Sequence, residues 1–155
     1  MKTNTTFRIA TAMLIPILAI ALSGVLHAEE KKDEHGKKDE APHKAPETYS
    51  EGVQQIEMHR DEIAELIKTA KLDDVHHHAE QIKKIAEKLA KLASKDDSGV
   101  AKTDIKEINL TAKALAAKFD PIDKAGDAGN KAETQKVFDE MVALIATLKK
   151  FATKK

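Results

Sequence analysis

From Thr48 to the C-terminus, apolar residues recur at spacings of three and four positions, with charged residues between them. This period is typical of a helix with one apolar face, and it predicts four helices joined by short polar segments. The predicted apolar faces consist of Tyr49, Val53, Ile56, Ile63 and Ile67; Val75, Ile82, Ile85, Leu89 and Leu92; Ile105, Ile108, Ala112, Leu115, Phe119 and Ile122; and Val137, Met141, Leu144, Leu148 and Phe151.

Polar and glycine residues mark the ends of these helices. Asp73 is the expected N-cap of the second helix, and the stretch 94–99 is the expected turn after it. Gly126 and Gly129 are expected to end the third helix, and Asn130 to cap the fourth. Because such short connections force consecutive helices to run antiparallel, we expect an all-α fold: an antiparallel up-down-up-down four-helix bundle over residues 48–155.

Pro121 is the one residue in conflict with this pattern. It lies inside the third predicted helix, where it lacks an N–H donor and crowds the carbonyl group of Ala117. The sequence therefore predicts a kink in that helix at the proline.

Residues 1–28 have the features of a secretory signal peptide. Lys2 and Arg8 precede an uncharged apolar run, Ile9–Leu26, and Ala28 supplies a small residue before the charged segment begins. The alternative is an uncleaved membrane anchor, since the apolar run is long enough to cross a bilayer. Export to a bacterial periplasm is the expected location, because the chain has no cysteine for the disulfides of most small secreted domains.

Residues 29–47 are predicted to be a disordered linker, because they are rich in charge and proline and carry no large apolar side chain. Over the whole chain, 26 basic and 26 acidic residues balance. This balance gives no reason to expect a nucleic-acid partner. The absence of cysteine also excludes thiolate metal sites, iron–sulfur clusters and covalently attached haem.

The candidate chemistry gathers toward the end of the bundle that holds the first and third helix connections. The non-apolar residues on the predicted faces are Arg60, His78, Gly126 and Thr134. Met141 is expected in the layer of Arg60, with His59 flanking the same face. Arg60 itself would repel a cation, and its simplest interpretation is a long side chain that reaches out to a carboxylate.

Three consecutive histidines, 76–78, follow Asp73 and Asp74. Successive helical residues point about 100° apart, so all three cannot bind one ion from a regular helix. The usable pairs lie four residues apart and join Asp73 to His77, Asp74 to His78 and His76 to Glu80. The alternative interpretation is a polar first turn with one partly buried histidine.

Imidazole and thioether groups bind copper, zinc or nickel. The residues that we expect to bind such an ion are His59, Asp74, His77, His78 and Met141.

The segment Phe119-Asp-Pro-Ile-Asp-Lys-Ala-Gly-Asp-Ala-Gly-Asn130, followed by Phe138 in an apolar helix, resembles the helix 3–4 region of exported four-helix-bundle cytochromes. These are the cytochromes of the c-prime and soluble b types, and the similarity in order and length runs from Thr48 to the C-terminus. The resemblance implies a four-helix bundle in the periplasm.

The haem ligands of both cytochrome types are missing from this chain. Where the c-prime type has Cys-x-x-Cys-His, the sequence reads Ile145-Ala-Thr-Leu-Lys149. Where the b type has a methionine on helix one, Val53 stands here, and the last helix has no histidine. A non-covalent haem held by His78 and Met141 is the form that a cytochrome-like function would take.

No phosphate-binding glycine loop, Gly-x-Ser-x-Gly elbow or His-Glu-x-x-His motif occurs in the sequence. We therefore predict a non-enzymatic binding or accessory protein, with a transition metal as its ligand. The alternatives are a cytochrome-like electron-transfer protein and a purely structural or interaction module. A membrane contact is expected only through an uncleaved signal segment, and the sequence names no protein partner.

Overall fold

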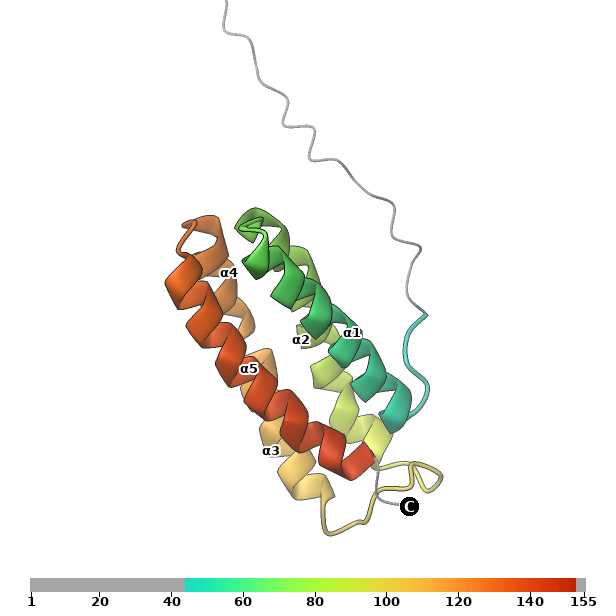
Figure 1. Cartoon of the computed structure of the whole chain (residues 1–155). Coiled ribbons are helices and arrows are strands. Elements are labelled where there is room, and N and C mark those ends of the chain that lie inside the picture. Colours follow the sequence, from blue (N-terminus) through green and yellow to red (C-terminus); the bar gives the residue numbers. More distant parts are fainter. Residues whose placement is uncertain (1–43, 153–155) are drawn as a thin grey trace, which may run out of the picture. The chain divides into compact units, whose positions relative to one another are not determined.

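The computed structural model describes residues 44–152 (Figure 1). The predicted signal peptide and residues 29–43 of the predicted linker lie outside the described residues. Within residues 44–152 every regular element is helical, which confirms the all-α class for this part of the chain. The elements are α1 (Tyr49–Lys68), the 3-10 turn η1 (Leu72–Asp74), α2 (Val75–Ala93), α3 (Ile105–Ala116), α4 (Phe119–Asp127) and α5 (Lys131–Ala152).

Helix α1 begins at a capping box. The N–H of Glu51 donates to Oγ1 of Thr48 at 3.2 Å, and the N–H of Thr48 donates to Oε2 of Glu51 at 3.2 Å. The two residues thus satisfy each other's unpaired backbone donors at the helix start. After Lys68 the chain turns through Ala70, whose φ of 59° lies in the left-handed region.

The start of α2 differs from the prediction that Asp73 caps it. Asp73 lies inside η1, and α2 begins at Val75 with Asp74 before it, a residue whose side chain makes no capping hydrogen bond. Leu72 and Val75 are buried on either side of the two aspartates. Burial of these apolar residues fixes how the chain enters α2, where the sequence alone suggested a side-chain cap.

The predicted third helix is divided into α3 and α4, and the break lies three to four residues before Pro121, at Ala117 and Lys118. A proline at position 121 has no N–H to donate to the carbonyl of Ala117 and would crowd it in a continuous helix. The chain instead closes a tighter turn there, in which the N–H of Lys118 donates to the carbonyl of Leu115 at 3.0 Å. Pro121 then occupies the first turn of α4, where its missing N–H has no intrahelical partner to lose.

Gly126 does not end a helix, contrary to the prediction; it lies inside α4 and is buried. A Cβ atom at this position would come within 2.9 Å of the carbonyl oxygen of Leu72. The glycine therefore permits α4 to approach η1 closely. Gly129, with a φ of +62°, makes the turn, and Asn130 caps α5 as predicted, because its side chain accepts from the N–H of Glu133 at 3.2 Å.

The core contains most of the predicted apolar faces, including every predicted apolar residue of α1 and α2. In α5 the prediction of Leu144 is only partly right, because Ile145 is fully buried and Leu144 only half-buried. Helix α1 packs against α2 and α5 (Figure 1). The hydroxyl of Tyr49, at the start of α1, donates to the carbonyl of Leu148 near the end of α5 at 2.9 Å.

Candidate functional site

Two histidines from neighbouring helices meet inside the helical core. His59 lies in the middle of α1 and is 2 % exposed, and His78 lies in the first turn of α2 and is half-buried. Their Nδ1 atoms are 3.2 Å apart, and their ring centroids are 5.5 Å apart with the planes tilted by 47°. The structure thus brings together two of the five predicted metal ligands.

The contact restricts the protonation of both rings. A hydrogen bond between two Nδ1 atoms needs one N–H donor and one lone pair, so at least one of the two imidazoles is neutral. A neutral imidazole nitrogen is also the form that binds a metal ion. The other ring nitrogen of His59, Nε2, is buried and has no hydrogen-bond partner within residues 44–152.

The distance between the two nitrogens suits a shared ion. Two imidazole nitrogens that each lie about 2.0–2.1 Å from one tetrahedral ion are about 3.3 Å apart. The observed distance of 3.2 Å between Nδ1 of His59 and Nδ1 of His78 is close to this nitrogen–nitrogen separation.

His59, and not Arg60, occupies the core position at this level, which corrects the prediction that Arg60 faces the seam. Both residues fit the helical period between Ile56 and Ile63, because 59 and 60 each lie three or four positions from these buried residues. The imidazole lies inside because it can be buried without a charge, whereas burying an unpaired guanidinium would cost far more.

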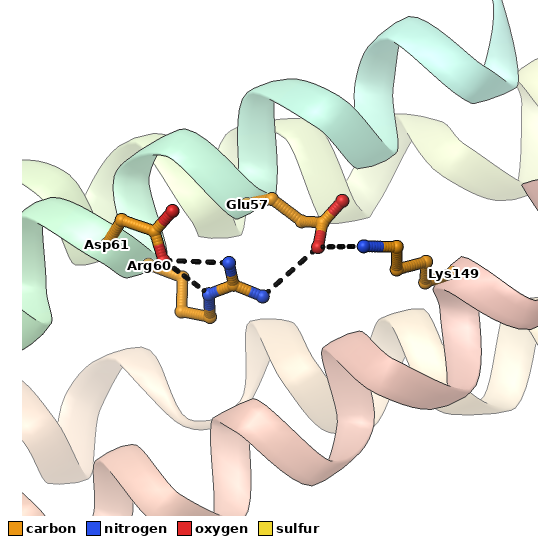
Figure 2. A network of polar contacts seen from close by, with 4 residues as sticks. All are labelled: Glu57, Arg60, Asp61 and Lys149. Atoms are coloured by element: carbon orange, nitrogen blue, oxygen red, sulfur yellow. Dashed lines mark hydrogen bonds and ion pairs between the residues drawn. The ribbon is translucent and has the colours of Figure 1, made fainter.

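The side chain of Arg60 instead reaches two carboxylates on its own helix (Figure 2). It donates to Oε1 of Glu57 at 3.1 Å and to Oδ1 of Asp61 at 2.7 Å. Oε1 of Glu57 also accepts from Nζ of Lys149 on α5 at 2.8 Å. The predicted carboxylate partner of Arg60 is therefore confirmed, and its charge is compensated by two acidic groups.

The remaining histidines of the tract point in other directions. Nδ1 of His76 lies 2.6 Å from Oδ1 of Asp123 on α4, and the ring stands edge-on to Phe119 at 5.5 Å. The predicted partner of His76, Glu80, pairs with Lys84 at 2.9 Å, and this hydrogen bond lowers the pKa of Glu80. The His76–Asp123 contact was not predicted, because it joins residues from helices far apart in the sequence.

His77 is exposed, and its ring meets that of His78 edge-on at a centroid distance of 5.5 Å. Asp74 is exposed in η1, and Met141 is 1 % exposed in the core. No group of three or more histidine, aspartate or glutamate side chains that could hold one ion occurs within the described part of the chain. Of the five predicted ligands, His59 and His78 are the two whose ring nitrogens lie within hydrogen-bonding distance of each other.

The sequence analysis grouped His59 with His78 in one predicted metal site, but it placed His59 beside the seam and Arg60 on it, whereas the structure buries His59. The signal was present, since His59 stands three residues after Ile56 and four before Ile63, on the buried stripe of α1.

Comparison with known proteins gives no match: no protein-family model fits this sequence, and no curated protein or solved structure is significantly similar to it. Between residues 44 and 152, no helix combines the length and apolar character needed to cross a membrane.

Proposed function

We propose that this chain is an exported, non-enzymatic protein that binds a transition metal ion in a helical bundle through His59 and His78. The observation that carries the proposal is the 3.2 Å contact between the two Nδ1 atoms, one ring buried and the other half-buried. Polar ring atoms are costly to bury in a hydrocarbon core, and a metal ion bound by both rings would offset that cost. Export to the periplasm rests on the sequence of residues 1–28.

The proposed architecture is the up-down-up-down bundle, in which α3 and α4 together form the third helix. End contacts support it. Tyr49 at the start of α1 contacts Leu148 near the end of α5, and Lys68 at the end of α1 accepts from Nζ of Lys131 at the start of α5, at 3.4 Å. Bundles of this kind bind metals and cofactors between facing helices, as the proposed site between α1 and α2 would.

The test is thermal unfolding of the full chain, first metal-free and then with one equivalent of Cu(I), Cu(II), Zn(II) or Ni(II). An ion that binds only the folded state raises the midpoint; at a free concentration one hundred times its Kd, the rise is about 10 °C for a domain of this size. The absorption spectrum of the protein as isolated is recorded beforehand. A Soret band would favour haem instead.

Variants locate the ion. His59→Asn and His78→Asn are each expected to abolish the rise, while His77→Asn and His76→Asn, changes in the same tract, keep it. If the midpoint does not move with any metal, the proposal is wrong and a structural or protein-binding role takes its place. If the response survives the His59→Asn/His78→Asn double variant, the ion binds elsewhere, and the assignment of these two histidines is wrong.

A further inference from the structure

We infer that a metal ion reaches the His59–His78 pair through His77, which binds it first at the surface and passes it to His78. This inference rests on the proposed function and adds the route by which the site is filled and emptied. It depends on the contacts among the three imidazole rings and on the order in which their exposure falls.

The three rings lead from solvent into the core. His77 is exposed, His78 is half-buried and His59 is 2 % exposed. The ring of His77 meets that of His78 edge-on, with the planes 81° apart and the centroids 5.5 Å apart. The centroids of His78 and His59 are also 5.5 Å apart, and their Nδ1 atoms are 3.2 Å apart. Each step inward thus joins two rings that are already in contact.

A buried site needs such a route, because a transition-metal ion in water carries a shell of water ligands. Removing that shell before any protein ligand is bound would leave a bare charge in a medium of low dielectric constant, which is very costly. Imidazole nitrogen is a common ligand of these metals and can replace the water molecules one at a time. An exposed imidazole in contact with His78 therefore lowers the barrier to entry.

The geometry of the helix explains why His77 acts on the path and not in the final site. His77 and His78 are consecutive residues of α2, so their side chains leave the helix about 100° apart. His78 reaches His59 on α1, while His77 stays at the surface. In the bound state the ion lies between His59 and His78, and His77 holds it only in transit.

His76 provides a comparison within the same tract. It is exposed like His77, but its Nδ1 lies 2.6 Å from Oδ1 of Asp123, and its ring stands edge-on to Phe119 at 5.5 Å. Both of these partners belong to α4. The tract therefore has one exposed histidine in contact with His78 and another that is held toward α4, and only the first is expected to carry the ion inward.

The experiment uses the full chain and the ion that raises its unfolding midpoint most. A coloured chelate of that ion, with pyridylazoresorcinol for a divalent ion or with bicinchoninate under exclusion of oxygen for Cu(I), is mixed with the protein in a stopped-flow instrument. The change in colour gives the rate of uptake, and an excess of the same chelator gives the rate of release. Competition at equilibrium gives the affinity independently.

We expect His77→Asn to slow uptake and release by the same factor, about tenfold, and to leave the affinity unchanged. A residue that acts only on the path changes the barrier and not the difference in free energy between the free and the bound ion, so both rates fall together. His76→Asn should take up and release the ion at the rates of the unchanged chain. Because His77 is exposed, the midpoint of the metal-free His77→Asn variant should also stay unchanged.

Three results would overturn the inference while leaving the proposed function standing. Unchanged rates in His77→Asn, or equal slowing in His76→Asn, would mean that contact with His78 does not define the route. Weaker binding with faster release in His77→Asn would mean that His77 is a permanent ligand. Failure of every ion to raise the midpoint would contradict the proposed function itself and the inference with it, so the two failures are distinguishable.

Discussion

The phenol of Tyr49 donates a hydrogen bond of 2.9 Å to the backbone carbonyl of Leu148, although the two residues lie 99 positions apart. Tyr49 is fully buried at the start of α1, and Leu148 is fully buried near the end of α5. The bond therefore fastens the first described helix to the last. It also gives the only tyrosine in the chain a defined partner.

Replacing Tyr49 with phenylalanine removes this bond and leaves the ring in place. We expect Tyr49→Phe to lower the free energy of unfolding by about 1 kcal/mol, the usual net value of a buried hydrogen bond. Urea denaturation measures this change in the free energy of unfolding, and the m-value should stay unchanged. If the variant is as stable as the unchanged protein, the hydrogen bond from Tyr49 to the Leu148 carbonyl makes no net contribution to the free energy of unfolding.

Alkaline pH should destabilise the protein through the same residue. Burial raises the pKa of the Tyr49 hydroxyl well above its ordinary value of 10. The unfolded chain therefore loses this proton above about pH 10 while the folded chain keeps it, so the stabilising contribution, complete below pH 10, falls as the pH rises. The expected slope is about 1.4 kcal/mol per pH unit.

Tyr49→Phe provides the control for this effect, because lysines titrate in the same range and affect both proteins equally. The difference in stability between the two proteins should narrow above pH 10. Absorbance at a tyrosinate wavelength reports Tyr49 alone, since no other tyrosine is present. A normal titration of Tyr49 in the folded protein would contradict its burial.

Gly126→Ala tests the close packing of α4 on η1. Its new Cβ would lie 2.9 Å from the carbonyl oxygen of Leu72, a backbone atom that cannot rotate away. We expect a loss of about 1–3 kcal/mol, despite the higher helix propensity of alanine. Thermal unfolding followed by circular dichroism measures this loss of stability.

Gly52→Ala is the matched control, a second buried glycine within a helix. The nearest atom to its new Cβ is a methyl carbon of Leu89 at 2.8 Å, at the end of a flexible side chain. The gain in helix propensity, about 1 kcal/mol, offsets this contact. Equal losses in the two variants would contradict the role assigned to the Leu72 carbonyl.

Glu57 joins α1 to α5 through Lys149 and also holds Arg60 (Figure 2). Its side chain is 19 % exposed, so its ion pairs are less screened than those at the open surface. We expect Glu57→Gln to lower stability by up to about 1 kcal/mol at low salt, and by less at 1 M salt. Urea denaturation at both salt concentrations measures the difference.

Glu65→Gln is the control variant for Glu57→Gln. It removes the ion pair between Glu65 and Lys68 on the same helix. That pair is solvent-exposed on both sides, so its loss should have almost no effect. A loss in Glu57→Gln that does not change with salt would mean that packing, and not charge, accounts for it.

His76 and Asp123 connect α2 to α4 at 2.6 Å. A double-mutant cycle with His76→Ala and Asp123→Ala should give a coupling energy of about 0.5–1 kcal/mol, because the two side chains are in direct contact and partly exposed. The coupling energy is obtained from thermal unfolding of the unchanged protein, the two single variants and the double variant. A coupling near zero would show that the contact contributes nothing to holding α4 against α2.

The amino-acid sequence by itself determined the helical class and most of the buried positions. A period of three and four residues has only one regular backbone conformation that places all its apolar members on one side. Local chemistry likewise predicted that Asn130 caps α5, because its side-chain oxygen lies within reach of the N–H of Glu133, three residues away.

Tertiary structure decided which of two adjacent residues turns inward. Positions 59 and 60 lie about 100° apart on α1, and both border the stripe between Ile56 and Ile63; the same holds for Leu144 and Ile145. The choice depends on what the neighbouring helices present and on whether a charge finds carboxylates outside the core, as Arg60 does. These neighbours come from distant parts of the chain, so periodicity could not show that His59, and not Arg60, takes the buried position opposite His78.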